Sequence, residues 1–352
     1  MTRLDCKAYR QDVAAVADLK LPWDRLDGKT ILLSGATGMI GSFLTDVLME
    51  KNRRGELAVR VIAMTRDPEK ASLRATPDWE RGVRFLQCDV SREKPEAGCP
   101  VDYVIHAASN THPVAYATDP IGTITTNIIG TQNMLEAAVS GGATRALFLS
   151  SVEIYGENRG DCEYFDEDYC GYLNCNTLRA GYPEGKRAGE ALCQAYIRQR
   201  NLDAVILRLP RIYGPTMLSS DTKAISQFLK KAVNREDIVL KSEGTQFYSY
   251  SYVADAVSGI LYCLLLGQCG EAYNLGDPGS DIRLRDLAAL IAGYAGRRVV
   301  FELPDATERA GYSKATKALL NGNKLKALGW MPSYPVATGI PRTITVLSEI
   351  NS

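Results

Sequence analysis

The residues best suited to act together in chemistry are Ser151, Tyr182 and Lys186, in the segments SSVEIYG and YPEGK. Tyr182 precedes Lys186 by four residues, and a helix places residues with this spacing on one face. A neighbouring ammonium lowers the pKa of a phenol, whose ordinary value is about 10. With Ser151 as a hydrogen-bond partner, Tyr182 is therefore predicted to act as a base near neutral pH, although exposed helices also carry such pairs by chance.

A carboxylate lies close to this group in the sequence. Glu153 follows Ser151 by two residues at the end of a predicted strand, so both side chains are predicted to face the same cleft. A carboxylate there can remove a proton from a carbon that a neighbouring ketone has made acidic. The alternative is a strand-end carboxylate that caps a turn or pairs with Arg187 or Arg211.

A glycine-rich turn with the sequence GATGMIG connects a predicted strand to a predicted helix. Glycines in this setting let the backbone approach a pyrophosphate at the positively polarised end of the helix. The sequence therefore predicts a bound dinucleotide. The residues of the turn expected to contact it are Gly35, Thr37, Gly38, Met39, Ile40 and Gly41.

The choice between NAD and NADP depends on residues 65–67 at the end of the second predicted strand. NAD enzymes usually place a carboxylate at this point to bind the ribose hydroxyls. This chain has Thr65 there, and the guanidinium of Arg66 suits a 2′-phosphate, which favours NADP over NAD. Alternatively, Arg66 is an exposed loop residue or stacks on the adenine, and Asp67 turns back to the ribose.

The elements that position these residues alternate as they do in a parallel sheet. Apolar runs predict buried strands at residues 30–34, 59–64, 83–87, 103–106, 146–150 and 204–209. Helical stretches separate them, and the first has one apolar face, at residues 40, 43, 44, 47 and 48. We predict an α/β fold, a doubly wound parallel sheet of Rossmann type with a smaller C-terminal substrate-binding lobe.

The chain, with 352 residues, is long enough for two parts that share a cleft. We expect an N-terminal arm at residues 1–28 and a dinucleotide-binding domain at residues 29–209. Residues 210–352 are expected to form mainly the substrate-binding lobe, with a part at about 247–280 that returns to the Rossmann domain.

Composition favours a small-molecule substrate. Lys plus Arg and Asp plus Glu both number 41, so no net charge draws the chain to nucleic acid or to an anionic membrane. Nine cysteines without a CxxC pair, a polar N-terminal segment and short apolar runs predict a reduced, cytoplasmic protein. The only histidines are His106 and His112, too few for a two-histidine metal site with supporting ligands, so no metal is expected.

The order of these motifs resembles the extended short-chain dehydrogenase/reductase family, the NAD(P)-dependent nucleotide-sugar epimerases, dehydratases and decarboxylases. The likeness runs from about residue 28 to residue 332, and it includes the glycine turn, CDV after the third strand, HAAS after the fourth, and the YxxxK pair. The stretches HAASNTHPVAYATDPIGTITTNIIGTQNML and LRAGYPEGKRAGEALCQAY most resemble UDP-glucuronate decarboxylases. The stretch SSVEIYG is also similar to the sugar-nucleotide 4,6-dehydratases.

The resemblance implies a role for each matched residue. Tyr182 takes the proton of the sugar's C4 hydroxyl, helped by Ser151 and Lys186, while a hydride passes to the nicotinamide. Glu153 then assists decarboxylation or dehydration at C5 before the hydride returns. The cofactor contacts implied beyond the glycine turn and Arg66 are Asp89, Val90, Ala107, Ala108, Ser109, Asn127, Tyr182 and Lys186.

Two other functions remain as alternatives, a nucleotide-sugar 4-epimerase and a catalytically silent protein that senses the cofactor. The intact Ser151, Tyr182 and Lys186 argue against the silent protein, because a sensor needs no base. The resemblance also implies a homodimer, formed by helices that include the one carrying Tyr182.

Three positions depart from the family pattern. Val152 stands where the dehydratases usually have an acid, so 4,6-dehydration is less expected. Tyr248 replaces an arginine of the decarboxylases, and Arg211 replaces a frequent substrate asparagine, which would move a positive charge to another strand. The candidate substrate contacts are Tyr116, Arg211, Lys223, Gln227 and Tyr248.

Overall fold

The computed structural model describes residues 2–111, 116, 118–302 and 315–351. Within these ranges the central element is a sheet made of β1 (Thr30–Ser34), β2 (Arg60–Thr65), β3 (Val83–Gln87), β4 (Tyr103–His106), β5 (Arg145–Ser151), β6 (Ala204–Leu209) and β10 (Ala272–Asn274). All its strands are parallel, in the order β10-β6-β5-β4-β1-β2-β3. The predicted Rossmann-type sheet is confirmed, and the six predicted strands lie within one residue of their expected bounds.

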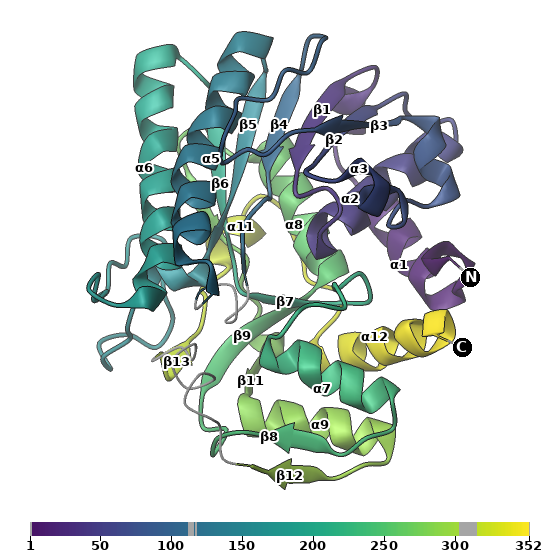
Figure 1. Cartoon of the computed structure of the whole chain (residues 1–352), viewed down its shortest axis with the longest axis vertical. Coiled ribbons are helices and arrows are strands. Elements are labelled where there is room, and N and C mark those ends of the chain that lie inside the picture. The colour runs from purple at the N-terminus through teal and green to yellow at the C-terminus, as the bar shows by residue number, and fades with distance from the viewer. Residues whose placement is uncertain (1, 112–115, 117, 303–314, 352) are drawn as a thin grey trace.

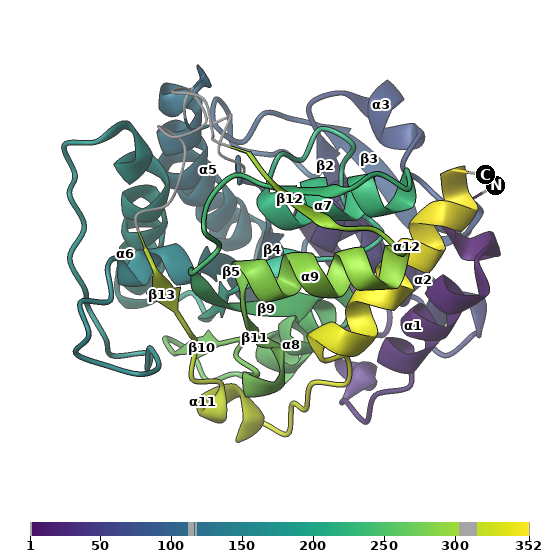
Figure 2. The ribbon, with the colours of Figure 1, turned by 90° about the horizontal axis from the view of Figure 1, so that it is seen from below.

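Helices cover both faces of this sheet (Figures 1 and 2). They are α2 (Met39–Arg53), α3 (Pro68–Ser72), α5 (Pro120–Gly141), α6 (Gly181–Arg200) and α8 (Val253–Leu266). Side chains of a strand alternate between the two faces. Ile31 and Leu33 therefore pack in the core with α2 and α8, while Leu32 packs in a second core with α5 and α6.

The C-terminal lobe lies below the central sheet in Figure 1. Its small sheet contains β7 (Arg211–Tyr213), β9 (Phe247–Tyr252), β11 (Asp281–Arg283) and β13 (Lys317–Ala318), and a separate pair is β8 (Ile238–Leu240) with β12 (Val299–Phe301). Its helices are α7 (Ala224–Val233), α9 (Leu284–Ala295) and α12 (Val336–Asn351), whereas the short helix α11 (Asn323–Lys326) packs on β10 and α8. Between these segments the chain returns to the central sheet, because α8 packs on β5 and β6 and β10 pairs with β6.

The N-terminal arm contains α1 (Lys7–Ala17), which packs against α2, α8 and α12, so the two ends of the chain lie side by side (Figures 1 and 2). A buried carboxylate on α2 binds residues of this arm. Asp46 accepts hydrogen bonds at 2.6 Å from Arg3 Nε, Tyr9 Oη and Trp79 Nε1. The arm is thereby tied to the helix that begins at the glycine turn.

A second buried carboxylate connects the arm to the lobe. Asp12 of α1 accepts hydrogen bonds from Tyr252 Oη of β9 at 2.6 Å and from Arg342 Nε of α12 at 2.7 Å. The arm therefore contacts both parts of the molecule through buried polar groups.

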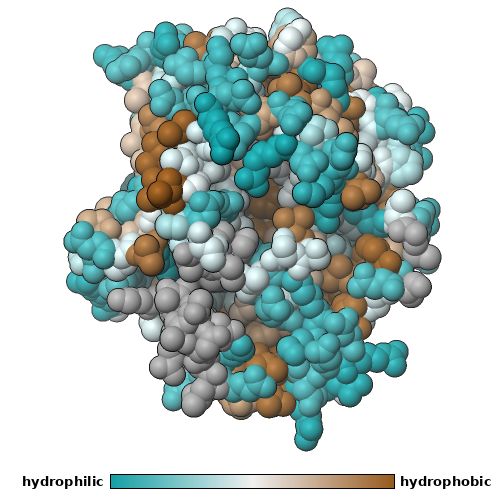
Figure 3. Space-filling view, viewed as in Figure 1, coloured by the Kyte–Doolittle hydropathy of each residue, from teal (hydrophilic) through white to brown (hydrophobic). Residues whose placement is uncertain are grey.

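The face shown in Figure 3 is mostly polar, and one of its hydrophobic areas lies over α5. Hydrophobic side chains gather on that part of the face shown in Figure 3, and the exposed apolar residues of this region are Ile121, Ile124, Ile129 and Leu178. No helix in the described ranges is long and apolar enough to cross a lipid bilayer.

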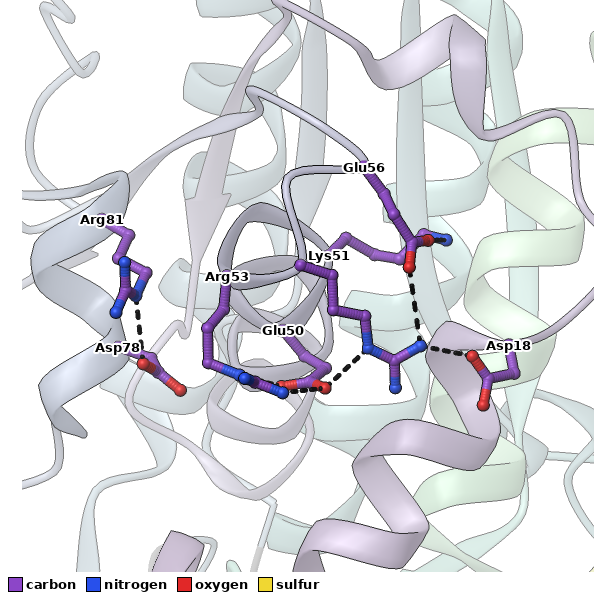
Figure 4. A network of polar contacts seen from close by, with 8 residues as sticks. Asp18, Glu50, Lys51, Arg53, Glu56, Asp78 and Arg81 are labelled. Carbon is purple, nitrogen blue, oxygen red and sulfur yellow. Dashed lines mark hydrogen bonds and ion pairs between the residues drawn. The ribbon is translucent and has the colours of Figure 1, made fainter.

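Ion pairs on the surface join the ends of α1 and α2 (Figure 4). Glu50 accepts hydrogen bonds at 2.7 Å from Arg53 and Arg54, and Arg54 also pairs with Asp18 after α1. Asp78 and Arg81 form a separate pair at 3.2 Å. Because such exposed pairs are screened by water, each contributes only about 0–1 kcal/mol to stability.

The substitution Asp46→Ala tests the role of the buried anchor. It leaves the buried guanidinium of Arg3 without its carboxylate, so we expect the free energy of unfolding to fall by about 3–5 kcal/mol. Urea unfolding measures the loss, and Asp78→Ala, which removes an exposed partner of Arg81, should cost less than about 1 kcal/mol. Equal small losses in the two variants would contradict the anchoring role of Asp46.

Candidate active site

A cavity of about 890 Å³ brings together residues that are far apart in the sequence. It lies where the strands β1, β4 and β5 end, as expected for parallel sheets, whose ligands bind beyond the carboxyl ends of the strands. The face in Figure 3 is hollowed between the central sheet and the lobe. The predicted site residues that line this cavity are Gly35, Gly38, Met39, Ile40, Gly41, Ala107, Ser109, Tyr116, Ser151, Glu153, Tyr182, Arg211, Lys223, Gln227 and Tyr248.

The glycine turn folds back too tightly for larger residues. Gly35 has a φ of +69°, and a Cβ there would lie 2.7 Å from the carbonyl carbon of Ala107. A Cβ at Gly41 would lie 2.3 Å from the carbonyl oxygen of Gly35. The first bond within α2 runs from Ser42 N to Gly38 O at 3.0 Å, so the N–H groups of residues 39–41 have no partner within the helix. This helix end, facing the cavity, fits the pyrophosphate of a dinucleotide.

The ends of β1 and β4 are tied together beside this turn. Ser34 Oγ accepts hydrogen bonds from the N–H groups of Ala107 at 3.1 Å and Ala108 at 3.2 Å, and lies 2.7 Å from His106 Nδ1. Burial lowers the pKa of His106 to about 3, so this imidazole is neutral and serves in packing. Ala107 and Ala108 are thereby held where the inner end of the cofactor is expected.

The predicted cofactor residues that do not line the cavity are Thr37, Arg66, Asp89, Val90, Ala108, Asn127 and Lys186. Asn127 is fully buried in α5, where its Oδ1 accepts from Ser109 Oγ at 2.9 Å and its Nδ2 donates to Thr123 O at 2.8 Å. Thr37 lies in the glycine turn itself, and Val90 is buried after β3. Asn127 therefore positions Ser109, which lines the cavity.

Arg66 and Asp89 lie at the ends of the neighbouring strands β2 and β3. Burial raises the pKa of Asp89, but hydrogen bonds from Ser91 and the charge of Arg66 outweigh burial and hold this pKa below its usual value. Arg66 is exposed. Asp67, the alternative ribose ligand, instead caps α3 by accepting from Lys70 N at 3.1 Å. Arg66 and Asp89 therefore lie near one another at the carboxyl ends of β2 and β3.

Tyr182 and Lys186 lie one turn apart in α6, both buried. Burial raises the pKa of Tyr182 to about 12, against a smaller lowering by the contact with Ser151. Burial also lowers the pKa of Lys186 to about 7, and its Nζ donates to Leu149 O at 2.8 Å, 6.0 Å from the centre of the Tyr182 ring. The predicted lowering of the phenol pKa is therefore not found, because desolvation outweighs the lowering by Ser151 and Arg179.

Glu153 faces two arginines in the turn that follows β5. Its Oε1 accepts a hydrogen bond from Arg179 Nη2 at 2.8 Å and lies 4.0 Å from Arg211 Nη2. Of the two partners considered from the sequence, Arg211 is near, whereas Arg187 donates to backbone carbonyl groups instead. The sequence interpretation missed Arg179, whose signal was its place three residues before Tyr182, one helical turn away.

Aromatic rings hold these arginines. The guanidinium carbon of Arg211 lies 3.4 Å from the centre of the Tyr248 ring, because β7 and β9 are neighbouring strands. That of Arg179 lies 5.0 Å from the centre of the Tyr116 ring, which in turn is 5.2 Å from the ring of Tyr182. Tyr116 and Tyr248 thus flank Glu153 and its two cations.

Three lysines also line the cavity, Lys223, Lys231 and Lys241. Lys223 Nζ pairs with Asp221 at 2.9 Å, and Gln227 Nε2 donates to the carbonyl oxygen of Asp221 at 3.1 Å. Lys231 and Lys241, which the sequence interpretation did not single out, also line the cavity. The described lining carries five Lys and Arg against three Asp and Glu, so it suits an anionic ligand.

In the parts of the chain that the structure describes, no group of three or more His, Cys, Asp and Glu is arranged to hold a metal. His112 lies outside the described residues.

Comparisons with known proteins agree with this geometry. The sequence model of the NAD dependent epimerase/dehydratase family matches residues 31–276. The chain is 31% identical to UDP-glucuronic acid decarboxylase 1 of Danio rerio over 323 residues, covering 92% of this chain and 73% of that protein. It is 32% identical to UDP-glucuronic acid decarboxylase 5 of Arabidopsis thaliana, covering 88% of this chain and 87% of that protein.

The fold is shared with solved enzymes. A dTDP-glucose 4,6-dehydratase from Streptomyces venezuelae, solved with NAD, superposes with a TM-score of 0.75 at 24% identity, over 91% of this chain and 97% of that one. A UDP-glucose 4-epimerase from Thermotoga maritima has a TM-score of 0.77 at 22% identity, over 92% of this chain and all of that one. The predicted resemblance is confirmed: the chain is an enzyme of the NAD-dependent epimerase/dehydratase family.

Proposed function

We propose that this enzyme modifies a nucleotide sugar by transient oxidation at C4, followed by chemistry at C5 and return of the hydride. The observation that carries the proposal is the shared cavity, whose lining includes Ser151, Glu153 and Tyr182 as well as the glycine turn. The phenol proposed as the base and a carboxylate therefore lie where a dinucleotide and a sugar would meet. The names of the relatives, UDP-glucuronic acid decarboxylases, support the same substrate class.

Each proposed step uses a group that the structure places beside the cavity. The glycine turn would hold a bound nicotinamide cofactor, which would supply the hydride acceptor and, through its oxidised ring, a positive charge that favours the phenolate of Tyr182. Tyr182 accepts the proton of the C4 hydroxyl, and Ser151 donates a hydrogen bond to the same oxygen. Once C4 is a ketone, Glu153 transfers the proton at C5 during decarboxylation or dehydration. Val152 offers no acid to a leaving hydroxyl, which favours decarboxylation.

We also propose NADP as the preferred cofactor, with NAD as the alternative. The support is the pair of Thr65 and exposed Arg66 at the end of β2, together with the engagement of Asp67 as a helix cap. A guanidinium there suits a 2′-phosphate.

A homodimer is a further part of this proposal. Its support is the exposed apolar group of Ile121, Ile124, Ile129 and Leu178, because α5 and α6 pack together and leave these side chains uncovered. A cytoplasmic location is proposed from the cysteines, since the structure describes all nine and none is in a disulfide.

The substitution Glu153→Gln distinguishes chemistry at C5 from simple epimerisation at C4. We expect loss of carbon dioxide or water to fall by about 10²–10⁴-fold, because the proton transfer at C5 loses its carboxylate. The variant is incubated with UDP-, dTDP-, GDP- and CDP-sugars, and mass spectrometry measures the loss of carbon dioxide or water. As the control, Tyr182→Phe removes the base and should abolish every product. Formation of an isomer of unchanged mass by Glu153→Gln at the wild-type rate would identify a 4-epimerase. A wild-type protein that binds cofactor and converts no sugar would be a silent sensor.

The substitution Arg66→Ala tests the cofactor preference. We expect the dissociation constant for NADP to rise about tenfold or more, because a charge-assisted contact to the 2′-phosphate is lost, and that for NAD to change little. Fluorescence titration with both reduced cofactors measures the two constants. A wild-type preference for NAD that the substitution leaves unchanged would overturn the proposal.

The double substitution Ile121→Asp with Ile124→Asp tests the dimer. We expect the wild type to have the mass of a dimer in light scattering and the variant that of a monomer, because two carboxylates cannot be buried unpaired in the contact. Leu73→Asp, at an exposed apolar residue away from α5, is the control and should stay dimeric. A monomeric wild type would remove the inference.

A further inference from the structure

A second acidic side chain, Glu190, lies one helical turn beyond Lys186 in α6. The two residues are four positions apart, so their side chains share a face of the helix. Two successive residues of β5 hold them there. Leu149 O accepts a hydrogen bond from Lys186 Nζ at 2.8 Å, and Ser150 Oγ donates to Glu190 Oε1. The ammonium and the carboxylate are therefore fixed against the same short piece of strand.

Arg208 on the neighbouring strand β6 pairs with this carboxylate. Its Nε donates to Glu190 Oε1 at 3.0 Å and its Nη2 donates to Oε2 at 2.7 Å. The side chains of Arg208 and Glu190 are only 10% and 13% exposed. A guanidinium that binds both oxygens favours the charged form of a carboxylate. The face of α6 that carries Lys186 therefore also carries a buried negative charge, which Arg208 partly neutralises.

Glu190 is the charged group that supports the ammonium of Lys186. Burial lowers the pKa of Lys186 to about 7, and the described side chains that raise it are Glu190 and Cys193. Burial raises the pKa of the Cys193 thiol to about 12, so this group is neutral at pH 7. Two further titratable neighbours are also neutral there, because burial raises the pKa of Tyr182 to about 12 and lowers that of His106 to about 3.

The charge of Lys186 matters for the phenol beside it. Lys186 Nζ lies 6.0 Å from the centre of the Tyr182 ring, and a cation at such a distance favours a phenolate, whereas a neutral amine does not. With a pKa near 7, Lys186 is on the border between its two forms at neutral pH. A nearby fixed charge therefore decides how much of the ammonium remains.

We propose that Glu190 is a positioning residue that keeps Lys186 protonated beside Tyr182, and that Arg208 sets the strength of this effect. The inference rests on the proposed function, which makes Tyr182 the base. Glu190 is not among the described residues that line the cavity, so it acts through Lys186 and not on the sugar or the cofactor.

The pKa of Lys186 can be followed by NMR without turnover, in protein whose lysines carry an isotope label at Cε. The signal of Lys186 is the one that Lys186→Met removes. In Glu190→Gln, which removes the negative charge, we expect this pKa to fall by about one unit or more. In Arg208→Gln, which leaves the carboxylate without its cation, we expect it to rise by about one unit. The two variants break the same ion pair and shift the pKa of Lys186 in opposite directions.

Glu136→Gln is the matched control. Glu136 accepts a hydrogen bond from Tyr196 Oη of the same helix α6 at 2.6 Å, but it is not among the groups that act on the pKa of Lys186. This pKa should stay within about 0.2 units of the wild-type value in the control.

An unchanged pKa of Lys186 in Glu190→Gln, or shifts of the same sign in the two ion-pair variants, would overturn the proposal. Where urea unfolding shows that Glu190→Gln is not folded, Arg208→Gln decides alone, and a pKa that fails to rise overturns the proposal.

The pH profile of turnover tests the consequence for the base, using a sugar of the UDP-, dTDP-, GDP- and CDP- panel that the wild type converts. At about pH 5.5 Lys186 is mostly charged in both proteins, so Glu190→Gln should work within about twofold of the wild-type rate. At about pH 9 we expect it to be slower by about tenfold, the factor by which the ammonium is less populated. A loss of the same size at every pH would assign Glu190 to folding alone and overturn the proposal.

The NMR titration separates this inference from the proposed function. Opposite pKa shifts in the two variants, in a wild-type protein that converts no sugar of the panel, would support the effect of Glu190 on Lys186 and overturn the proposed function. Conversion of a sugar by a protein in which the pKa of Lys186 ignores Glu190 would do the reverse.

Discussion

The parallel sheet places the carboxyl ends of β1, β4 and β5 at one edge, and the candidate site is built outward from this edge. The register pairs Ser34 with His106, and β5 follows β4 in the same direction. The glycine turn after β1, Ala107 after β4 and Ser151 at the end of β5 therefore open into one cavity. The helix α6 then only has to pack against β5 to bring Tyr182 to the same place.

The site combines this geometry with strong desolvation. Burial moves the pKa of Tyr182 up to about 12 and that of Lys186 down to about 7, so each group favours its neutral form. The buried phenol of Tyr182 therefore needs an additional positive charge nearby before it can lose its proton near neutral pH. In the proposed function, the positive charge of an oxidised nicotinamide ring would meet this requirement.

The N-terminal arm is hydrogen-bonded both to the central domain and to the C-terminal lobe. Its Tyr9 bonds to Asp46 on α2, the helix that begins at the glycine turn, and its Asp12 bonds to Tyr252 on β9. The same strand β9 carries Tyr248, which holds Arg211 beside Glu153. Contacts of the N-terminal arm thus connect the helix that begins at the glycine turn with the strand that carries Tyr248.

The sequence alone determined the features that have a period or a fixed local spacing. Alternation of apolar runs with helical stretches predicted the sheet, the glycine spacing predicted the turn, and the four-residue step predicted that Tyr182 and Lys186 share a helix face. Only the tertiary structure decided which charges meet, since Arg179, Arg211 and Glu153 come from three different elements. It also decided how far desolvation raises the pKa of Tyr182, because burial depends on contacts from the whole fold and leaves no local pattern in the chain.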